Sequence, residues 1–390
     1  MRAVNGSAYV ALDSSLTGDS WRLGLQRSET IVRCEADGRT CALYEAGRIV
    51  RRFEGPLEAL DWFGQGQGRW VGYLSYDLGR WFERLPARAE DDLRLPLLAF
   101  ARVTGEGEDA RPEPVELSAA ALTSNFSRQA YIEAVERAIE YIRAGDIFQV
   151  NLSQRFMAGL PVQPIEIYRR LSERFPAAYG AYLDFGDHAL ICNSPELFLR
   201  VIPESRRVIT RPIKGTRPRL PGMEEELRAS VKDQAELNMI VDLERNDLGR
   251  VCEIGSVRVS QPRAIEAHPT VYHGVATVEG VLRRGVGLVD LLRATFPGGS
   301  VTGAPKIRAM EIIDELEPTR RGPYCGAIGY IAADGSMEFN VAIRTMIVKG
   351  GRVHIPVGGG VVADSSPEGE YEETLVKARA MFEVLEVAVD

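Results

Sequence analysis

Hydrophobic and polar residues follow two different periods along the chain. Apolar residues recur at helical spacing over 127–146, where Ser127 is a candidate N-cap and Gly145 a candidate C-terminal stop. From residue 147 the period changes to two, which is typical of a strand with two distinct faces. One face of this strand is expected to carry Phe148, Val150 and Leu152, and the other Gln149, Asn151 and Ser153.

The rest of the pattern predicts strands with helices inserted between them. The aromatic-rich run 70–86 is typical of a buried strand that leads into a helical turn. Asp334-Gly335 and Gly350-Gly351 are typical of hairpin turns, so the last three strands are expected to pair as one antiparallel meander. This succession indicates an α+β fold rather than a doubly wound α/β fold. Further strands are expected at 189–202, 206–216, 325–333, 337–349 and 352–362, and helices at 223–247, 304–315 and 367–386.

Length and composition place the chain among folded globular proteins. Its 390 residues suffice for one large domain or two medium ones, and the content of 45% hydrophobic and 26% charged residues excludes a disordered chain. Gly, Pro and acidic residues cluster at 104–116, which indicates an exposed loop. We expect this loop to separate a β-rich N-terminal part, 1–120, from the part that carries the chemistry, 121–390, with one core shared between them.

The net charge and the cysteines exclude several other classes of protein. The net charge of −8 is spread along the chain, so no basic stripe favours nucleic acid. The chain lacks both a long apolar run and a signal-peptide core, so we expect no membrane association and a cytoplasmic location. The five cysteines are odd in number and include no C-x-x-C pair, which argues against a disulfide framework or a zinc-thiolate site.

Two helical segments each carry a pair of acids three residues apart. Glu370 and Glu373 would project from one face of a helix that Ser366 can cap, and Asp233 and Glu236 would do the same on another helix. Either pair alone fits an ordinary solvated charged turn. Together, the two pairs would make a cage of oxygen atoms suited to Mg²⁺.

Glycines mark two places where a ligand could approach the backbone. Gly358–Gly360 interrupt a strand pattern, where they give up packing and conformational entropy. The loop 296–306 precedes a helix and carries Ser300, but it is no P-loop, because Ala304 stands where Lys is required. Its amides could cradle an anion, or the loop could be a structural turn, and the sequence leaves both readings open.

Lys214 and His273 are candidate reactive side chains. Lys214 lies in a short strand, where a lysine is most often simply exposed. If it points into a site instead, desolvation and the nearby Arg211 and Arg217 would lower its pKa and make the amine a nucleophile. The same two interpretations apply to His273, since a lone histidine is more often structural than catalytic.

Several long motifs together resemble one family. From about Ser127 to Leu385, the chain is similar to the chorismate-utilising enzymes, which include anthranilate synthase component I, aminodeoxychorismate synthase component I and the isochorismate and salicylate synthases. The resemblance implies a sandwich of antiparallel β-sheets flanked by helices. The motifs that carry it are GDIFQVNLSQRF, NSPELFLR, TRPIKGTRPR, AELNMIVDLERNDLGR, FPGGSVTGAPKIRAMEIIDELEP, GYIAADGSMEF and GGGVVADSSPEGEYEET.

Two positions distinguish the branches of this family. Anthranilate synthases read P-I-A-G-T where this chain has P-I-K-G-T with Lys214. Isochorismate and salicylate synthases carry a water-activating Lys where this chain has Gln149. The combination of Gln149 and Lys214 therefore resembles the aminodeoxychorismate synthase branch. There the nucleophile is ammonia, which, unlike water, needs no general base to activate it. The resemblance implies that Lys214 attacks C2 of chorismate while Glu196 protonates the departing C4 hydroxyl, and that ammonia then adds at C4.

The resemblance also implies ligands and a partner. Mg²⁺ would be held by Glu236 and Glu373, with Asp233 and Glu370 reaching it directly or through water. A separate glutamine amidotransferase subunit would supply ammonia, because the chain has no glutaminase motif of its own. The implied substrate contacts are Gln149, Gly215, Thr216, His273, Ser300, Tyr324, Arg344, Gly358, Gly359, Gly360 and Lys377.

Two other readings remain open from the sequence. Anthranilate synthase component I is the nearest alternative, and Lys214 argues against it. A catalytically silent chorismate-binding partner is the other, and the intact acids at 236, 370 and 373 argue against that one.

Overall fold

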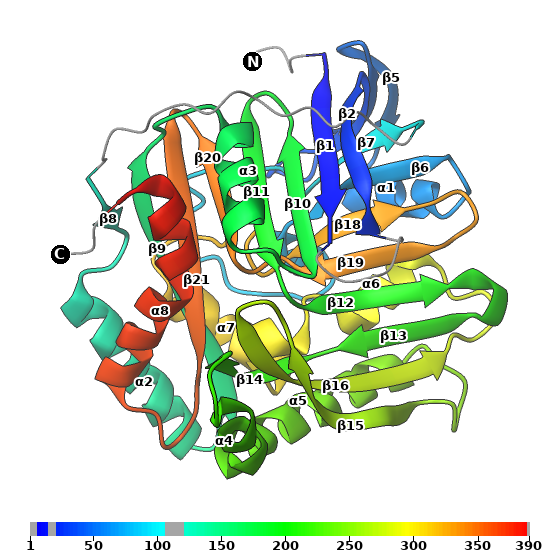
Figure 1. The fold of residues 1–390 in the computed structure, drawn as a ribbon. Coiled ribbons are helices and arrows are strands. Elements are labelled where there is room, and N and C mark those ends of the chain that lie inside the picture. The colour runs from blue at the N-terminus through cyan, green and yellow to red at the C-terminus, as the bar shows by residue number, and fades with distance from the viewer. Residues whose placement is uncertain (1–5, 15–20, 106–120, 388–390) are drawn as a thin grey trace.

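The structure is a computed structural model that describes residues 6–14, 21–105 and 121–387 (Figure 1). Within these ranges two large sheets cross each other, and all strand pairings inside them are antiparallel. The predicted α+β fold of antiparallel sheets flanked by helices is confirmed. The boundary expected at 104–116 falls almost entirely outside the described residues, so the division of the chain at residue 120 stays a prediction.

The smaller sheet joins strands from both ends of the chain. It has nine strands in the described residues. Its order is β17 (Gly303–Ala304), β9 (Gln149–Gly159), β21 (Arg352–Val361), β20 (Thr345–Lys349), β11 (His188–Ser194), β10 (Tyr179–Asp184), β1 (Ala8–Asp13) and β2 (Leu23–Ser28), with β8 (Thr123–Ser124) paired to β9.

The larger sheet has twelve strands in the same described ranges. Its order is β14 (Ile213–Pro218), β16 (Val271–Val281), β13 (Arg207–Arg211), β12 (Leu197–Ile202), β19 (Met337–Val341), β18 (Ala327–Ile331), β6 (Arg69–Leu74), β7 (Leu98–Val103), β3 (Thr30–Cys34), β4 (Cys41–Glu45) and β5 (Arg48–Phe53), with β15 (Arg258–Ala267) paired to β16. A buried apolar cluster that includes Val10 and Leu190 from the smaller sheet and Tyr73 and Ile328 from the larger one fills the space between the sheets.

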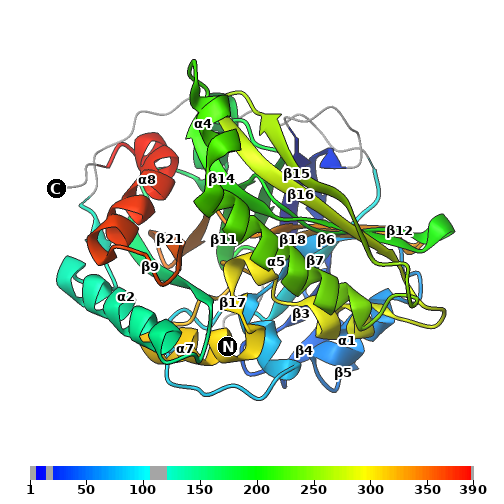
Figure 2. The same cartoon turned by 90° about the horizontal axis from the view of Figure 1, so that it is seen from below.

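Helices cover the outer faces of both sheets. Helices α2 and α8 pack side by side against the smaller sheet, and α5 runs along β15 and β16 of the larger one (Figure 2). The helices are α1 (Pro56–Phe63), α2 (Arg128–Arg143), α3 (Pro164–Arg174), α4 (Met223–Ala229), α5 (Val231–Gly249), α6 (Leu288–Thr295), α7 (Lys306–Leu316) and α8 (Pro367–Leu385), with short 3-10 turns η2 (Tyr76–Trp81), η3 (Pro203–Ser205) and η4 (Gly299–Val301).

Local signals in the sequence place most helix ends correctly. Ser127 caps α2 by accepting from the amide of Ala130, and Ser366 caps α8 by accepting from the amide of Gly369. The helix expected over 223–247 is two helices, because Ser230 adopts an extended conformation and its hydroxyl caps α5. A single periodic pattern therefore concealed a break between two helices.

The strand expected after α2 is confirmed as β9, but Phe148 does not share the buried face of Val150 and Leu152. Phe148 precedes the first ladder pair of β9 and is 70% exposed. Gln149 and Asn151, on the opposite face, are buried as well. Both faces of this strand are therefore covered.

The antiparallel meander expected for the last three strands is wrong. The two hairpin turns at Asp334-Gly335 and Gly350-Gly351 form as predicted, joining β18 to β19 and β20 to β21. Between them, however, the chain leaves the larger sheet after Val341 and enters the smaller sheet at Thr345. Arg344, with φ of 51°, lies in this crossing. The sequence pattern of 337–349 predicts one uninterrupted strand and does not reveal such a change of sheet.

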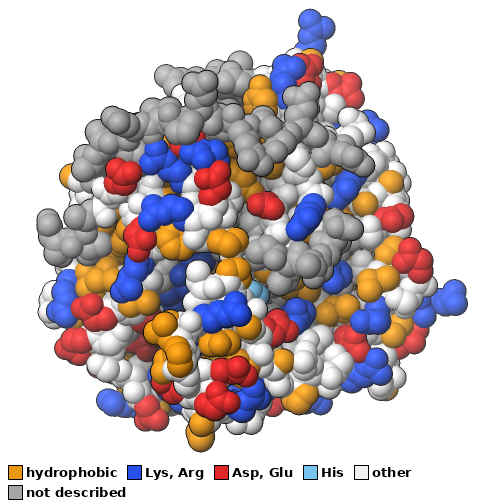
Figure 3. Space-filling model, viewed as in Figure 1, with side chains coloured by type: hydrophobic (Ala, Val, Ile, Leu, Met, Phe, Trp, Pro, Cys, Tyr) orange, Lys and Arg blue, Asp and Glu red, His pale blue; other side chains and the backbone are white. Residues whose placement is uncertain are grey.

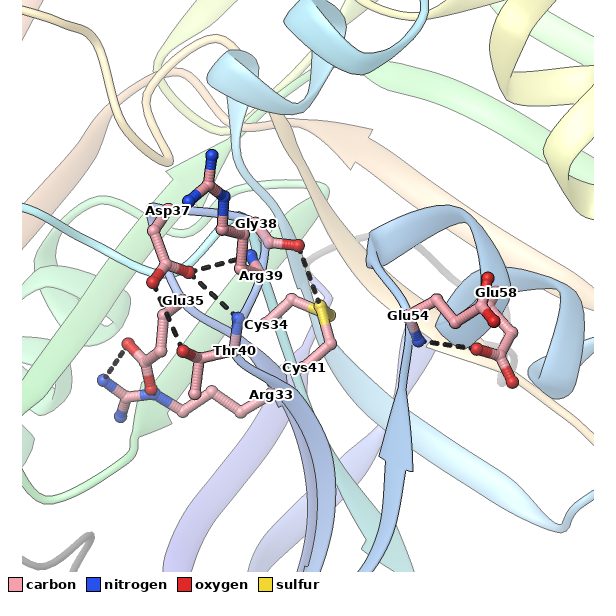
Figure 4. Close-up of a disulfide and its surroundings, with 10 residues drawn as sticks. All are labelled: Arg33, Cys34, Glu35, Asp37, Gly38, Arg39, Thr40, Cys41, Glu54 and Glu58. Atoms are coloured by element: carbon pink, nitrogen blue, oxygen red, sulfur yellow. Dashed lines mark hydrogen bonds and ion pairs between the residues drawn. A yellow bond between two sulfur atoms is a disulfide. The ribbon is translucent and has the colours of Figure 1, made fainter.

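One pair of cysteines forms a disulfide, which the number and spacing of the cysteines did not indicate (Figure 4). Cys34 and Cys41 lie directly opposite each other in the β3–β4 hairpin, with Cα atoms 4.0 Å apart, and they form a disulfide. Pairing across strands is set by register, which the seven-residue separation does not show. Cys192, Cys252 and Cys325 are free and buried.

The surface shows no segregation of charge on the face seen in Figure 3, where acidic and basic side chains are interspersed. No helix in the described part of the chain is long and apolar enough to cross a membrane.

Candidate functional site

The predicted site residues come together where the two sheets, α5 and α8 meet. Helix α5 packs against β14 and against the η4 loop, and α8 packs against β21. Figures 1 and 2 both show β14 and the N-terminal half of α5 on one side and β21 and α8 on the other. Segments distant in the sequence therefore supply the walls of one site.

Lys214 is aimed by a bulge in β14. The ladder with β16 pairs Ile213 with Val275 and then Thr216 with His273, so Lys214 and Gly215 are left unpaired. Gly215 has φ of 83°, a conformation that side chains rarely adopt. Bulges of this kind redirect a side chain relative to the flanking strand.

The surroundings of Lys214 favour a neutral amine. Burial lowers its pKa, and Lys377 lowers it further, while Glu236, Glu196 and Glu373 oppose the shift. The expectation that Arg211 and Arg217 supply the neighbouring positive charge is wrong. Those two side chains pair instead with Glu266, and with Glu226 and Asp233. Lys377 reaches Lys214 from α8, which sequence proximity did not indicate.

The three glycines of β21 form the floor of the site. A Cβ atom placed on Gly360 would overlap Gln149 Nε2 and lie 3.3 Å from Lys214 Nζ. One placed on Gly359 would lie 2.8 Å from Glu370 Oε2 and 3.5 Å from Glu373 Oε1. Any side chain at either glycine would therefore fill the space between the amine and the acids, which is the close backbone approach that the sequence pattern predicts.

The acids of α5 and α8 face one another across this floor. Burial raises the pKa of Glu236, and the charges of Asp233 and Glu373 raise it further against Lys214 and Lys232. Burial also raises the pKa of Glu370, and Glu373 adds to this, while a 2.6 Å hydrogen bond from Ser365 opposes it. The mutual repulsion of these carboxylates is what a bound cation would relieve.

The same acids differ in how far they are already neutralised. Glu373 pairs with Lys377 at 2.6 Å, and Asp233 pairs with Arg217 at 3.1 Å. Glu370 Oε2 is buried without a hydrogen-bond partner among the described residues. Across the same ranges, no three His, Cys, Asp or Glu side chains form a ready-made metal site. A metal held here would therefore need substrate or water oxygens as well, which is typical of Mg²⁺.

Glu196 is a carboxyl group suited to hold a proton near neutral pH. It is 4% exposed, and burial raises its pKa to about 7, although Ser300 and Lys214 oppose the shift. Ser300 Oγ lies beside it in the η4 loop but makes no hydrogen bond of normal geometry within the described residues. Ser300 is thus part of the site. The anion-binding role considered for its loop stays a prediction.

The remaining predicted contacts line the site from β14, β16 and the crossing between the sheets. Thr216 Oγ1 and His273 Nδ1 share a hydrogen bond of 2.9 Å, and burial lowers the pKa of His273 to about 3, with His268 and Arg344 adding to the shift. His273 is therefore neutral. Arg344 donates to the carbonyl of Lys377 and has no ion-pair partner among the described residues, which leaves guanidinium donors for a carboxylate. Tyr324 is buried, and burial raises the pKa of its phenol.

Two side chains of the site were not singled out from the sequence. Asn151 Oδ1 is buried without a partner in the described structure and would lie 3.1 Å from a Cβ atom on Gly358. Ser365 positions Glu370 through its hydroxyl. The polar face of the strand after 147 contained the signal for Asn151, because it alternates with Val150 and Leu152.

The chain belongs to the family of chorismate-binding enzymes, because the model of that family, described as chorismate binding enzyme, matches residues 14–383. Among curated relatives, anthranilate synthase component 1 of Thermus thermophilus is 44% identical over 388 residues, which cover 89% of this chain and 82% of the relative. Aminodeoxychorismate synthase component 1 of Bacillus subtilis is 39% identical over 396 residues, which cover 89% of this chain and 84% of the relative. Overall similarity therefore does not separate the two activities.

Solved structures support the same family fold. The crystal structure of anthranilate synthase component I from Streptococcus pneumoniae superimposes with a TM-score of 0.79 at 30% identity, over 98% of this chain and 93% of that one. A structure of a putative isochorismate synthase, DhbC, from Bacillus anthracis superimposes with a TM-score of 0.71 at 22% identity, over 99% and 97% of the two chains. The second comparison supports the fold alone.

Proposed function

We propose that the chain is the aminating component of an aminodeoxychorismate synthase, which converts chorismate and ammonia to 4-amino-4-deoxychorismate for para-aminobenzoate and folate biosynthesis. The observation that supports this most is the place of Lys214. Its amine lies beside Gln149 and Gly360, next to the acids and glycines to which we assign the binding of the metal and the substrate. An alanine there, as in the anthranilate branch, would leave the site without this nucleophile.

The proposed reaction has two displacements. In the first, the neutral Lys214 amine forms a bond to C2 of chorismate, the bond from C4 to its hydroxyl breaks, and Glu196 gives its proton to the departing hydroxyl, which leaves as water. In the second, ammonia forms a bond to C4 and the bond between C2 and Lys214 breaks. The attacking nitrogen then returns a proton to Glu196. The net reaction exchanges a hydroxyl for an amine and keeps the pyruvyl group.

Mg²⁺ is the proposed cofactor, held by Glu236 and Glu373 with Asp233 and Glu370 close by. The unpartnered Oε2 of Glu370 and the facing acids fit a hard cation with oxygen ligands. When bound, the ion would neutralise the ring carboxylate of the substrate. Arg344 and the amides of Gly358–Gly360 would orient the substrate.

Replacing Glu373 by Gln should raise the Mg²⁺ concentration needed for half-maximal turnover by about tenfold or more, because one charged ligand is lost. The fold should persist, since the side chain is half-exposed in the second turn of α8. Turnover measured across a Mg²⁺ titration checks this. Glu372→Gln, one residue away on the exposed face, is the matched control. Wild-type turnover of Glu373→Gln at limiting Mg²⁺ contradicts the assignment.

The purified chain should form product with ammonium salts and not with glutamine, because a separate amidotransferase subunit is the proposed ammonia source. With ammonium, the rate should rise with the concentration of free ammonia, since only the neutral form is a nucleophile. Product formation measured with each nitrogen source checks this. Glutamine-dependent amination by this chain alone would contradict the proposed partner.

Analysis of the product tests the function as a whole. Incubation with chorismate, Mg²⁺ and ammonium should yield a 4-amino product that still contains the pyruvyl group, identified by mass and chromatography. Release of anthranilate and pyruvate would instead support the anthranilate synthase alternative, which the 44% identical relative keeps open. Absence of any product, with chorismate bound, would support a silent binding partner.

A further inference from the structure

Four arginines gather around one pocket far from the candidate active site. The pocket has a volume of about 400 Å³ and lies between the end of α5, the loop that follows β16, and α6. Arg250 closes α5, and Arg283 and Arg284 lie in the loop. Arg293 lies in the last turn of α6. Along α5, Arg250 is about 20 Å from Glu236, as judged from the helical rise per residue. The pocket is therefore separate from the chorismate site.

Three of these guanidinium groups form no ion pair among the described residues, although Arg250 lies close enough to Asp247 to oppose the rise that burial causes in the pKa of that carboxyl. These three arginines come from different elements: Arg250, Arg284 and Arg293 lie at the end of α5, in the loop after β16 and in α6. Arg283 is different, because it donates to the carbonyls of Cys252, at 3.0 Å, and of Arg250, at 2.6 Å. It thereby fixes the end of α5 against the loop and holds the pocket wall in place.

The acidic groups nearby do not neutralise the pocket. Asp290 is the acid among the lining residues, and its Oδ2 accepts from the amide of Gly287 to cap α6. Glu253 pairs with Arg206 at 2.9 Å. A local excess of positive charge therefore persists in a chain whose net charge is −8.

Apart from the arginines and Asp290, the lining consists of Gly285 and three apolar residues. Val251, Val286 and Ala294 lie between the arginines, and Val251 and Ala294 are buried. The pocket volume is in the range of small-molecule sites. Planar guanidinium groups match the oxygens of phosphate in pairs.

We propose that this pocket binds a small ligand that carries a diphosphate group. The unpaired guanidinium groups of Arg250, Arg284 and Arg293 would contact the phosphate oxygens. Such a group can belong to free diphosphate or to a nucleoside diphosphate, and the two are distinguished by the experiment below.

Titration calorimetry with inorganic diphosphate, ADP and adenosine, at constant ionic strength and without divalent cations, tests the proposal. We expect saturable 1:1 binding of diphosphate or ADP, and tighter binding of ADP would identify the nucleotide. Arg284→Ala and Arg293→Ala should each weaken binding, raising the dissociation constant by about tenfold or more. Arg245→Ala, which removes an exposed arginine elsewhere on α5, should leave it unchanged.

The unfolding temperature of each variant without ligand shows whether its fold is intact. No saturable binding of either phosphate compound would overturn the proposal. Equal weakening by Arg245→Ala, or binding of adenosine as tight as that of ADP, would do the same. Chorismate turnover is not a readout here, so failure of this proposal is distinguishable from failure of the proposed function.

Discussion

Lys214→Ala should lower the rate of 4-amino product formation by at least about 10³-fold, because removal of a covalent nucleophile typically costs that much or more. Without the lysine, the first displacement at C2 cannot occur. Residual amination should shift to C2, since ammonia no longer competes with an amine of the enzyme for that carbon. Chromatographic separation of the 2-amino and 4-amino products checks both expectations.

The lysine variant needs controls for charge and for folding. Lys232→Ala removes an exposed lysine that, like Lys214, influences the pKa of Glu236, and it should keep the product unchanged. Binding of chorismate to Lys214→Ala should persist, because Arg344 and the glycines of β21 remain. Undiminished 4-amino product from Lys214→Ala would rule out the covalent role.

Glu196→Gln should lower turnover by about 10²–10⁴-fold, which is the usual contribution of general acid catalysis. The amide keeps the size of the side chain but cannot give up a proton to the C4 hydroxyl. The pH dependence provides a second readout. Because burial raises the pKa of Glu196 to about 7, the carboxyl is protonated below that pH and loses its proton above it. Turnover at a fixed concentration of free ammonia should therefore fall as the pH rises through 7.

In the Gln variant this fall should disappear, since no proton is lost at position 196. Glu253→Gln, which breaks a surface ion pair with Arg206, is the matched control and should keep both the rate and the pH profile. A Glu196→Gln enzyme with the wild-type rate and profile would remove Glu196 from the proposed mechanism.

Features that depend on neighbours in the sequence could be predicted from it. Ser127 and Ser366 cap helices because their hydroxyls reach amides three residues away. Glu370 and Glu373 share a helical face for the same local reason. The resemblance to the family predicted that these residues belong to one site. The structure brings Lys214, Glu196 and the acids together in one place.

Features that depend on contacts between distant segments could not be predicted. The cation next to Lys214 is Lys377, which reaches it only because α8 packs on β21. The disulfide of Cys34 and Cys41 depends on the register of one hairpin. The sheet change around Arg344 lies inside the segment 337–349, whose residues are typical of a strand on both sides of the crossing.

That sheet change has a counterpart directly beside it. The chain also passes from the smaller to the larger sheet between β11 and β12, where Glu196 lies. The two crossings are joined by backbone hydrogen bonds, from the amide of Val341 to the carbonyl of Glu196 at 3.0 Å and from the amide of Asn193 to the carbonyl of Arg344 at 3.0 Å. The first bond extends the pairing of β12 with β19 in the larger sheet, and the second extends the pairing of β11 with β20 in the smaller sheet, so the two crossing segments are tied to each other at both ends. Amide hydrogens at both crossings should consequently exchange with solvent only when the whole protein unfolds, which makes this part of the site as rigid as the core itself.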